Sequence, residues 1–334
     1  MSYDCNFDIS VCSSSPLVTV VIPVFNVDKY IKKCLLSVIG QTYKNLEILC
    51  IDDVGTDDSM KKVISFLSQE PRIRVIRHKE NLGLGPTRNS GIQEAKGDFI
   101  YFLDSDDWIK PYVIERLVQK ALMNASDIVV GSGVAFPDTE DLTLKKSAEK
   151  INEWLKLEGV PQRITLSNFR YSLGLLPCVA WGKLYKTSFI VKNKLAFIDK
   201  KVCHEDNGFY IKCMSCNPKI SVVNDYGYQY RIRNASLMNF GGDSEERDLE
   251  HLRLSIEDAL GYLINTNKHE EYATFVKDLY WKFFAFRKSG LLFYWGRYTK
   301  ILKIWRVSLF KQTCKSGGGR AHSRDSNVEV ALIF

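Results

Sequence analysis

The chain has 334 residues, 45% of them apolar and 25% charged, so it can bury one large or two modest cores. Its 46 Lys and Arg outnumber its 39 Asp and Glu, and the net charge of +7 suits an anionic ligand or a membrane surface without requiring nucleic acid. No window of about 18 residues is apolar and free of charge, which argues against a transmembrane helix.

The cysteines indicate a reducing compartment. There are nine, at positions such as Cys34, Cys50 and Cys178, and their spacing follows no regular framework, which favours free thiols in a cytosolic protein. The N-terminal stretch MSYDCNFDISVCSSSP has two acids and no basic region followed by an apolar run, so we do not expect a secretory signal. We therefore expect a cytoplasmic protein.

Strand-like apolar runs alternate with helical patterns from residue 17 to residue 103. This alternation predicts an α/β fold with a mostly parallel sheet and helices on both of its faces. In chain order we expect a strand at Leu17–Pro23, a helix at Asp28–Gly40, a strand at Leu46–Ile51, a turn at Thr56–Ser59 that caps a helix through Val63, Ile64 and Leu67, a strand at Ile73–Ile76, a turn at Glu80–Gly85, a helix at Pro86–Ala95 and a strand at Phe99–Leu103.

The later part of the chain is less regular. Residues 137–165 are polar and should form a loop with some helix, whereas Trp181–Phe189 and Ile220–Tyr230 are typical of strands and turns. From Leu249 the pattern is helical, so we place a boundary near position 240. Residues 316–334 begin with a glycine linker and lack an amphipathic pattern, and we interpret them as a vector or frameshift remnant.

Acidic residues follow the ends of the predicted strands. Ligands of such sheets bind beyond the carboxyl ends of the strands, where Pro23–Asn26, Asp52-Asp53 and Asp104–Asp106 should meet. Carboxylates gathered there repel one another unless a cation shares the site, and oxygen ligands suit Mg²⁺ or Mn²⁺. Taken alone, the Asp-x-Asp pattern is more typical of a solvated turn or a helix cap than of a metal site.

Four motifs follow one another along the first part of the chain: VTVVIPVFNVDKYIKKCLLSVIGQTYKNLEILCIDD, GTDDS, ENLGLGPTRNSGI and FIYFLDSDDW. In their order and spacing they resemble family 2 glycosyltransferases, inverting enzymes with the Rossmann-like GT-A fold. The resemblance covers about residues 17–130 and continues more weakly to about residue 240, and it implies a UDP-sugar donor.

The resemblance also implies roles for single residues. Pro23 and Phe25 would pack around the uracil, and Asp53 would accept a hydrogen bond from it. Arg88 would lie beside the phosphates. A core aromatic and a solvated helix face are the alternatives for Phe25 and Arg88. The full set expected to bind the nucleotide-sugar is Pro23, Phe25, Asn26, Asp52, Asp53, Arg88, Asp104 and Ser105.

By the same resemblance, Asp104 and Asp106 would bind Mn²⁺ or Mg²⁺, with Asp106 the more direct ligand through the diphosphate. One departure concerns the turn after the second strand, where the family often has Asp-Gly-Ser-Thr-Asp and this chain has Asp53-Val54-Gly55-Thr56-Asp57. Because the glycine is only displaced, we expect the turn to survive.

Inverting transfer needs a carboxylate that takes the proton from the acceptor hydroxyl. The segment His204-Glu205-Asp206 resembles the family's His-Glu-Asp segment, whose last residue is the proposed base. We therefore expect Asp206 to be the base, with Glu205 as the alternative and His204 as a metal ligand or a positioning group. An acid-rich helix start would also explain the segment.

Two further segments, AWGKLYK (Ala180–Lys186) and YQYRIRNASLM (Tyr228–Met238), resemble stretches of bacterial enzymes that build surface polysaccharides. They suggest an acceptor side of the site. The aromatic residues would stack on sugars and the arginines would hold the diphosphate or an anionic acceptor, although core packing would explain them equally well. The residues concerned are Trp181, Tyr228, Tyr230, Arg231 and Arg233.

A structural zinc site is a less favoured alternative. Cys203, His204, Cys213 and Cys216 offer four soft ligands, and the last two cysteines have zinc-knuckle spacing. Only one such pair is present, however, and the other two residues are adjacent in the sequence. Buried thiols on a helix are the simpler interpretation of Cys213 and Cys216.

A basic and aromatic stretch at Tyr280–Gln312 suggests contact with a membrane. It contains eight Lys and Arg residues, no acid, and interleaved Trp, Tyr, Phe and Leu, which is typical of an interfacial helix in anionic headgroups. Packing of these helices on the rest of the protein is the alternative. No motif that reads nucleic acid accompanies this charge, so we do not expect a nucleic-acid partner.

Together these features predict a metal-dependent enzyme on the inner face of the cytoplasmic membrane. It would transfer a hexose or N-acetylhexosamine from a UDP-sugar to a lipid-linked or oligosaccharide acceptor of lipopolysaccharide, lipooligosaccharide or capsule. A nucleotidyltransferase would need a glycine-rich, basic phosphate loop early in the chain. The segment PVFNVDKY, at that place, is not such a loop. A non-catalytic binding protein is the other alternative.

The expected organisation is a tail (1–16), a GT-A domain (17–240) with a nucleotide-sugar half (17–130) and an acceptor half (131–240), a helical extension (241–315) and a second tail (316–334).

Overall fold

The computed structural model describes residues 15–157, 159–161, 163–164, 176–233 and 244–266. These residues belong to one compact unit, Met1–Leu279, and the rest of the chain forms a second unit, Tyr280–Phe334. The basic stretch and the C-terminal tail therefore lie outside the described residues, and the predictions made for them stay predictions.

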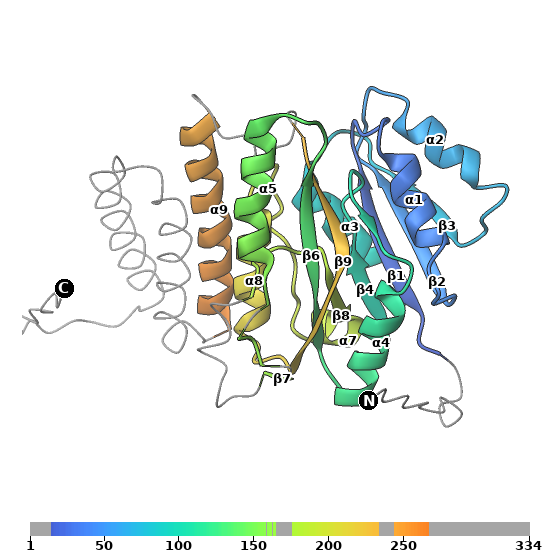
Figure 1. Cartoon of the computed structure of the whole chain (residues 1–334). Helices are drawn as coiled ribbons and strands as arrows, with labels where there is room; N and C mark the ends of the chain where they lie inside the picture. Colours follow the sequence, from blue (N-terminus) through green and yellow to red (C-terminus); the bar gives the residue numbers. More distant parts are fainter. Residues whose placement is uncertain (1–14, 158, 162, 165–175, 234–243, 267–334) are drawn as a thin grey trace, which may run out of the picture. The chain divides into compact units, whose positions relative to one another are not determined.

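The described residues form a mixed α/β fold around one sheet (Figure 1). The strands follow the order β3-β2-β1-β4-β8-β6-β9-β5, and β7 pairs with β9. Their bounds are β1 Val18–Val24, β2 Leu46–Asp52, β3 Ile73–Arg77, β4 Phe99–Phe102, β5 Trp108–Ile109, β6 Ile128–Pro137, β7 Arg163–Ile164, β8 Lys183–Lys186 and β9 Ile220–Ile232. The helices are α1 Ile31–Ile39, α2 Ser59–Phe66, α3 Leu84–Glu94, α4 Val113–Asn124, α5 Leu142–Leu155, α7 Thr187–Lys192, α8 Glu205–Met214 and α9 Ser244–Asn265.

The first half of the sheet confirms the predicted parallel arrangement. β1 pairs in parallel with both β2 and β4, and β2 pairs in parallel with β3. Parallel strands need a crossover connection, which α1, α2 and α3 provide. α3 begins two residues before the predicted start, so Pro86 is still in the first turn, where its missing N–H matters little.

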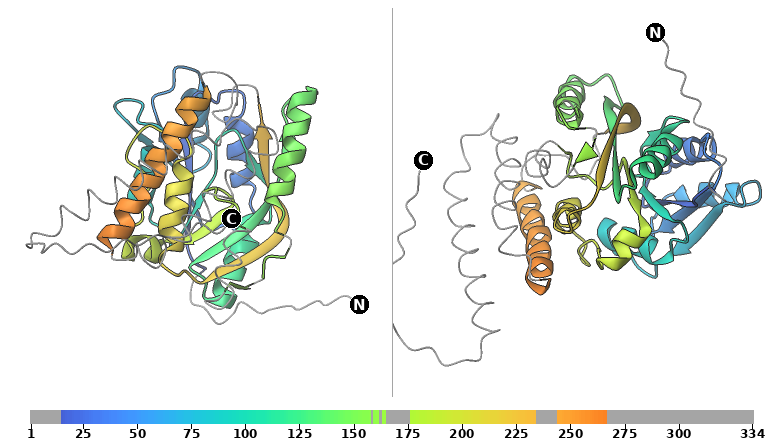
Figure 2. Two further views of the ribbon diagram at one scale, coloured as in Figure 1. Left: turned by 90° about the vertical axis from the view of Figure 1, so that its left-hand side faces the viewer. Right: turned by 90° about the horizontal axis from the view of Figure 1, so that it is seen from below.

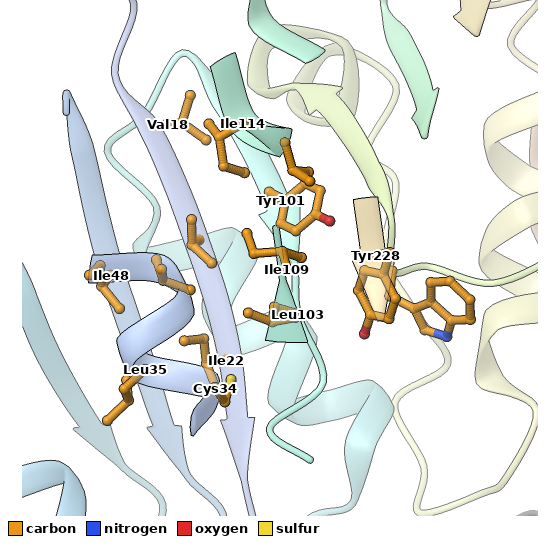
Figure 3. Packing of buried hydrophobic residues seen from close by; sticks show 14 of the residues in the cluster. Val18, Ile22, Cys34, Leu35, Ile48, Tyr101, Leu103, Ile109, Ile114 and Tyr228 are labelled. Carbon is orange, nitrogen blue, oxygen red and sulfur yellow. The ribbon is translucent and has the colours of Figure 1, made fainter. Parts of the chain in front are cut away.

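Alternate residues of β1 face opposite layers, as expected for a strand. Val20 and Ile22 belong to the apolar cluster that includes Leu35 of α1 and Ile114 of α4 (Figure 3). Val21 faces the other way, against α3, where a Cβ added to Gly91 would lie 2.3 Å from its Cγ1 atom. The sheet is therefore covered on both faces, and α3 packs very closely on β1.

The second half of the sheet is mixed. β8 runs antiparallel to β4 and to β6, whereas β6 and β9 are parallel with a register shift between Gly131 and Gly133. Within the stretch predicted as a loop with some helix, α5 covers 14 residues and buries Leu144, Ala148 and Leu155. This half places the ends of β6 and β9 beside the residues that follow β4.

α9, which lies in the stretch predicted as a helical extension from about position 240, packs directly on α8 (Figure 2). A Cβ on Gly208 would lie 2.4 Å from the carbonyl oxygen of Ser255, and the ammonium of Lys212 pairs with Asp258. The buried apolar stripe of α9 itself consists of Leu252, Ile256, Ala259 and Leu263.

No helix among the described residues has the length and the apolar run needed to span a membrane.

Candidate active site

The carboxyl ends of β1, β2 and β4 meet at one edge of the sheet. The backbone N–H of Asp53 donates to the carbonyl of Val24 (3.0 Å), and that of Leu103 donates to the carbonyl of Val21 (3.0 Å). The structure thereby brings together the three segments singled out in the sequence, which are Pro23–Asn26, Asp52-Asp53 and Asp104–Asp106.

The side chain of Asp53 organises the loop that follows β3. Its carboxylate accepts hydrogen bonds from the backbone N–H groups of Leu82 (2.8 Å) and Gly83 (2.9 Å) and from the amide of Asn81 (3.1 Å). Nδ1 of His78 lies 2.9 Å from the same carboxylate. Only 5% of the Asp53 side chain is exposed. The role that this structure gives to Asp53 is to hold the loop, and its hydrogen bond to a base stays a prediction.

Asn81 is a site residue that sequence reasoning did not assign. Its Nδ2 atom donates to Asp53, whereas its Oδ1 atom is buried and has no hydrogen-bond partner in the described part of the chain. A buried carbonyl oxygen without a donor is unfavourable, so this atom is available to a donor from a ligand. The residue lies within the motif ENLGLGPTRNSGI, which marked the segment but not this side chain.

The turn after β2 survives the departure from the family's sequence. Val54 has a φ of 60° and Asn26 has a φ of 50°, so both adopt the left-handed conformation. Oδ1 of Asn26 accepts from the N–H of Thr56 (2.8 Å), and a Cβ on Gly55 would lie 2.9 Å from that oxygen. Phe25, next to this turn, is 44% exposed, which places its ring outside the core and within reach of a ligand.

Asp52 and Pro23 are both buried at the strand ends. The carboxylate of Asp52 accepts from Nε of Arg77 (2.6 Å) and from the N–H of Val54 (3.0 Å). Asp52 therefore fixes the start of the turn, whereas Pro23 lies within β1 and its packing around a uracil stays a prediction.

Arg88 joins the end of β4 to the start of α8. Its Nη2 atom lies 2.7 Å from Oδ1 of Asp104, and its Nη1 atom lies 2.6 Å from both Oε1 of Glu205 and Oδ1 of Asp206. The side chain is 1% exposed, with its guanidinium 5.4 Å from the ring of Phe197. We expected Arg88 beside phosphates, but in this structure its partners are three carboxylates. Because Arg88 is buried, the alternative that it lies on a solvated helix face is wrong.

Negative charge exceeds positive charge in this cluster, because three carboxylates share one guanidinium. Burial and the charge of Asp206 raise the pKa of Glu205 to about 8. Burial also raises the pKa of Asp104, although Arg88 opposes the shift. Glu205 therefore binds a proton more tightly than an exposed glutamate does. The Asp206 side chain is 17% exposed and that of Glu205 only 6%, so Asp206 is the more accessible acid of the two.

The acids after β4 are stabilised in two ways. Asp106 forms an ion pair with Arg233, whose Nε atom lies 2.8 Å from Oδ2. Asp107 is buried and accepts hydrogen bonds from the hydroxyl of Tyr228 (2.7 Å) and from the backbone N–H of Arg231 (2.7 Å). Burial raises the pKa of Asp107 well above its usual range. Asp107 therefore shapes the loop, and Asp106 faces the site.

The aromatic residues expected on the acceptor side stack on one another. The ring of Trp181 lies 4.2 Å from that of Tyr228 and 5.2 Å from that of Tyr230, nearly parallel to both. Trp181 is 5% exposed and Tyr228, labelled in Figure 3, is 1% exposed, and both belong to the buried apolar cluster. The structure thus corrects our expectation for these two rings, whose faces contact protein rather than sugar. Tyr230 is partly exposed and remains a candidate.

Arg231, near the end of β9, and Arg233, just after β9, have different partners. Arg231 pairs with Asp138, and its Nε atom donates to the backbone carbonyl of Asp106 (2.8 Å). Its guanidinium lies 4.6 Å from the ring of Tyr30, whose hydroxyl donates to Asp138 (2.9 Å). Arg231 therefore ties the loop after β4 to α1 and β6. Arg233 pairs with the carboxylate of Asp106 and is the better candidate to contact a diphosphate.

His204 is buried immediately before α8, with a φ of 64°. Within the described ranges, no three or more His, Cys, Asp or Glu side chains are grouped so that they could hold a metal ion by themselves. The structure thus gives no support to His204 as a metal ligand or to a zinc site with Cys203, Cys213 and Cys216.

The edge does fit an ion that protein and substrate share, since Mg²⁺ and Mn²⁺ can be bound by one or two carboxylates together with phosphate oxygens. The side chains of Asp104 and Asp106 are 21% and 20% exposed, and burial and then the charge of Asp106 raise the pKa of Asp104. A cation between them would relieve this repulsion. Ser105, which separates them, is buried.

Comparison with known proteins agrees with this geometry. Residues 19–182 match the family model for glycosyl transferase family 2. Glycosyltransferase GlyA of Streptococcus pneumoniae serotype 4 (strain ATCC BAA-334 / TIGR4) is 34% identical over 226 residues, which are 66% of this chain and 31% of GlyA. Glycosyltransferase GlyG of the same strain is 31% identical over 231 residues, which are 67% of this chain and 73% of GlyG. The chain thus spans about a third of GlyA and about three quarters of GlyG.

A solved structure supports the fold. The crystal structure of S. aureus TarS 1-349 in complex with UDP-GlcNAc aligns with a TM-score of 0.57 and 23% identity, over 73% of this chain and 66% of the other. At this level of identity the likeness concerns the GT-A fold alone. On the sequence matches and the shared fold, the chain belongs to glycosyltransferase family 2.

Proposed function

We propose that the chain is a metal-dependent inverting glycosyltransferase that moves a hexose or N-acetylhexosamine from a UDP-sugar to a hydroxyl of a growing cell-surface glycan. The observation that carries this proposal is the bridge formed by Arg88, which holds Asp104 and Asp206 in one buried cluster. Asp104 is expected to lie beside the diphosphate, and Asp206 is the expected base. TarS, similar in fold, binds UDP-GlcNAc in its solved complex, which motivates the choice of UDP.

Asp206 is the proposed general base. The acceptor oxygen attacks the anomeric carbon, the bond from that carbon to the diphosphate breaks, and the hydroxyl proton moves to the carboxylate of Asp206. Arg88 holds Oδ1 of Asp206, and the backbone N–H of Ala180 donates to Oδ2 (3.1 Å). Glu205 is less suitable as a base, because its raised pKa favours the protonated form and its side chain is buried.

The departing diphosphate gains negative charge, which nearby cations must stabilise. Asp104 and Asp106 are the proposed ligands of Mn²⁺ or Mg²⁺, which would supply positive charge beside the diphosphate oxygens. Arg233 is partly exposed and already pairs with Asp106, so its guanidinium can be shared with the diphosphate.

The proposed uridine site lies at the ends of β1 and β2. The exposed ring of Phe25 offers a surface to the base, and the unpartnered Oδ1 atom of Asn81 offers an acceptor to an N–H group. Asp53 holds the loop that carries Asn81. An aromatic surface and a hydrogen-bond acceptor at this edge support the proposal that it binds uracil.

The acceptor is proposed to be lipid-linked or an oligosaccharide of lipopolysaccharide, lipooligosaccharide or capsule. The basic, aromatic segment Tyr280–Gln312 motivates peripheral contact with the inner face of the cytoplasmic membrane. Cosedimentation with phosphatidylglycerol vesicles, and not with phosphatidylcholine vesicles, is the expected result. Failure to bind phosphatidylglycerol vesicles at low salt would contradict membrane contact.

Thermal unfolding with UDP, GDP or CMP, each with and without Mn²⁺, tests the donor site, because a ligand that binds only the native state raises its melting temperature. We expect the melting temperature to rise with UDP only when Mn²⁺ is present. This rise should disappear in Asp106→Ala. It should persist in Glu149→Ala, which replaces an exposed acid on α5. Asp206→Asn should keep the shift and lose transfer. No shift with any nucleotide would favour a non-catalytic protein, and full transfer by Asp206→Asn would reject the assigned base.

A further inference from the structure

Lys183 of β8 is a buried cation that the proposed mechanism does not use. Its side chain is 1% exposed, and its ammonium donates to the backbone carbonyls of Pro177 (2.9 Å) and Val179. Across the ranges that the structure describes, Lys183 forms no ion pair. Burial lowers the pKa of Lys183 to about 8. Burying an ammonium without a carboxylate partner is unfavourable, so this lysine is a candidate for a functional role.

The segment that Lys183 holds, Pro177–Ala180, leads directly to the proposed base. We call these four residues the 177–180 segment. The hydroxyl of Tyr185, two residues along β8, donates to the carbonyl of Ala180 (3.2 Å). Two buried side chains from the same face of β8 therefore anchor three carbonyls of this segment. The N–H of Ala180, at its end, donates to Oδ2 of Asp206 (3.1 Å).

We propose that Lys183 is a positioning residue for Asp206. By fixing the 177–180 segment, its ammonium directs the N–H of Ala180 toward Oδ2, while Arg88 holds Oδ1 from the other side. This inference rests on the proposed function, in which Asp206 takes the proton from the acceptor. A carboxylate held from two sides has one orientation toward the acceptor, and orientation of a reacting group contributes strongly to rate.

Lys183→Met tests the inference because it keeps most of the length of the side chain and removes its donors. Tyr185→Phe weakens the same anchor at a second point, and Lys186→Met changes an exposed lysine of the same strand as a control. In the full chain we would measure hydrogen exchange of the amides at 178–182, and kcat and KM for UDP release from UDP-glucose and UDP-N-acetylglucosamine with Mn²⁺.

We expect at least tenfold faster exchange in Lys183→Met, a smaller increase in Tyr185→Phe and none in Lys186→Met. The kcat should fall at least tenfold in Lys183→Met with the KM for the donor within twofold of its original value, since the uridine and metal residues are untouched. A general loss of structure would instead change KM and exchange throughout the chain.

Unchanged exchange at 178–182 in both variants, or an unchanged kcat with exchange increased, would overturn the inference. If Lys183→Met fails to fold, Tyr185→Phe decides by the same two readouts. Asp206→Asn separates this inference from the proposed function, because activity retained in that variant rejects the base itself. If the unaltered protein releases UDP from neither sugar, the donor assignment fails and hydrogen exchange alone decides whether Lys183 holds the segment.

Discussion

Nη1 of Arg88 lies 2.6 Å from Oδ1 of Asp206, although the two residues are 118 positions apart in the sequence. This contact ties α3, which packs on β1, to the first turn of α8. The same guanidinium binds Asp104 at the end of β4. One buried arginine therefore sets the distance between the expected diphosphate site and the expected base.

Replacing Arg88 with methionine should lower the free energy of unfolding by about 3–5 kcal/mol, because it leaves Asp104, Glu205 and Asp206 close together without a cation. Urea denaturation measures this loss, and transfer activity should fall with it.

Arg116→Met is the matched control. Arg116 is 51% exposed and its Nη1 atom lies 3.7 Å from Asp225, so its loss should change stability by only about 0–1 kcal/mol. Similar losses in the two variants would show that the buried cluster has no special role in stability.

The close contact between α3 and β1 should tolerate no side chain at Gly91. A Cβ there would lie 2.3 Å from Cγ1 of Val21, so Gly91→Ala should destabilise the protein by about 1–3 kcal/mol and reduce activity by displacing Arg88, one turn away. Thermal unfolding and UDP release measure the two effects.

Gly261→Ala provides the contrast, because a Cβ at Gly261 in α9 meets no atom within 4 Å. Alanine should stabilise that helix by about 0.5–1 kcal/mol. If Gly91→Ala were as stable as Gly261→Ala, α3 would have to pack on β1 less closely than the structure shows.

The parallel half of the fold was predictable from the sequence because its signals are local. Apolar runs of strand length, such as β1 and β2, end at acids or proline and alternate with helical patterns. The edge where Asp53 and Asp104 lie follows from that order by topology alone.

The partners of individual side chains were not predictable, because they depend on contacts between distant segments. A basic residue at position 88 fits phosphates as well as carboxylates, and only the packing of α3 against α8 decides between them. Trp181 likewise has the surface to stack on a sugar or on another ring, and the register of β9 places Tyr228 and Tyr230 against it. The role of Lys183 depends on carbonyls that no sequence pattern reveals.

Stability should fall as pH rises through the range in which Glu205 titrates. The folded state raises its pKa from 4.5 to about 8, so the folded protein binds this proton more tightly than the unfolded chain does. The resulting stabilisation is fully present below pH 4.5 and is lost as pH rises to about 8, with a slope of at most about 1.4 kcal/mol per pH unit.

Glu205→Gln keeps the neutral form at every pH, so its unfolding free energy should fall less steeply over this interval. Asp104 and Asp107, whose pKa values are also raised, remain in both proteins, and the difference in slope therefore reports Glu205. Glu149→Gln on the exposed side of α5 should leave the slope unchanged. Parallel curves for Glu205→Gln and the unaltered protein would contradict the raised pKa.

Val54 adopts a φ of 60°, a left-handed conformation that is unfavourable for a β-branched residue, and its side chain is partly exposed. Glycine removes a strain of about 1–2 kcal/mol but adds about 0.5–1 kcal/mol of chain entropy on unfolding, so Val54→Gly should stabilise the protein by about 0.5–1 kcal/mol. The same substitution at Val191, exposed within α7, should destabilise by about 0.3–0.5 kcal/mol, since a helix has no strain to relieve and glycine is a slightly poorer helix former than valine. Opposite signs in thermal unfolding are the expected result, and destabilisation of similar size at both positions would mean that the turn after β2 does not hold Val54 in the left-handed conformation.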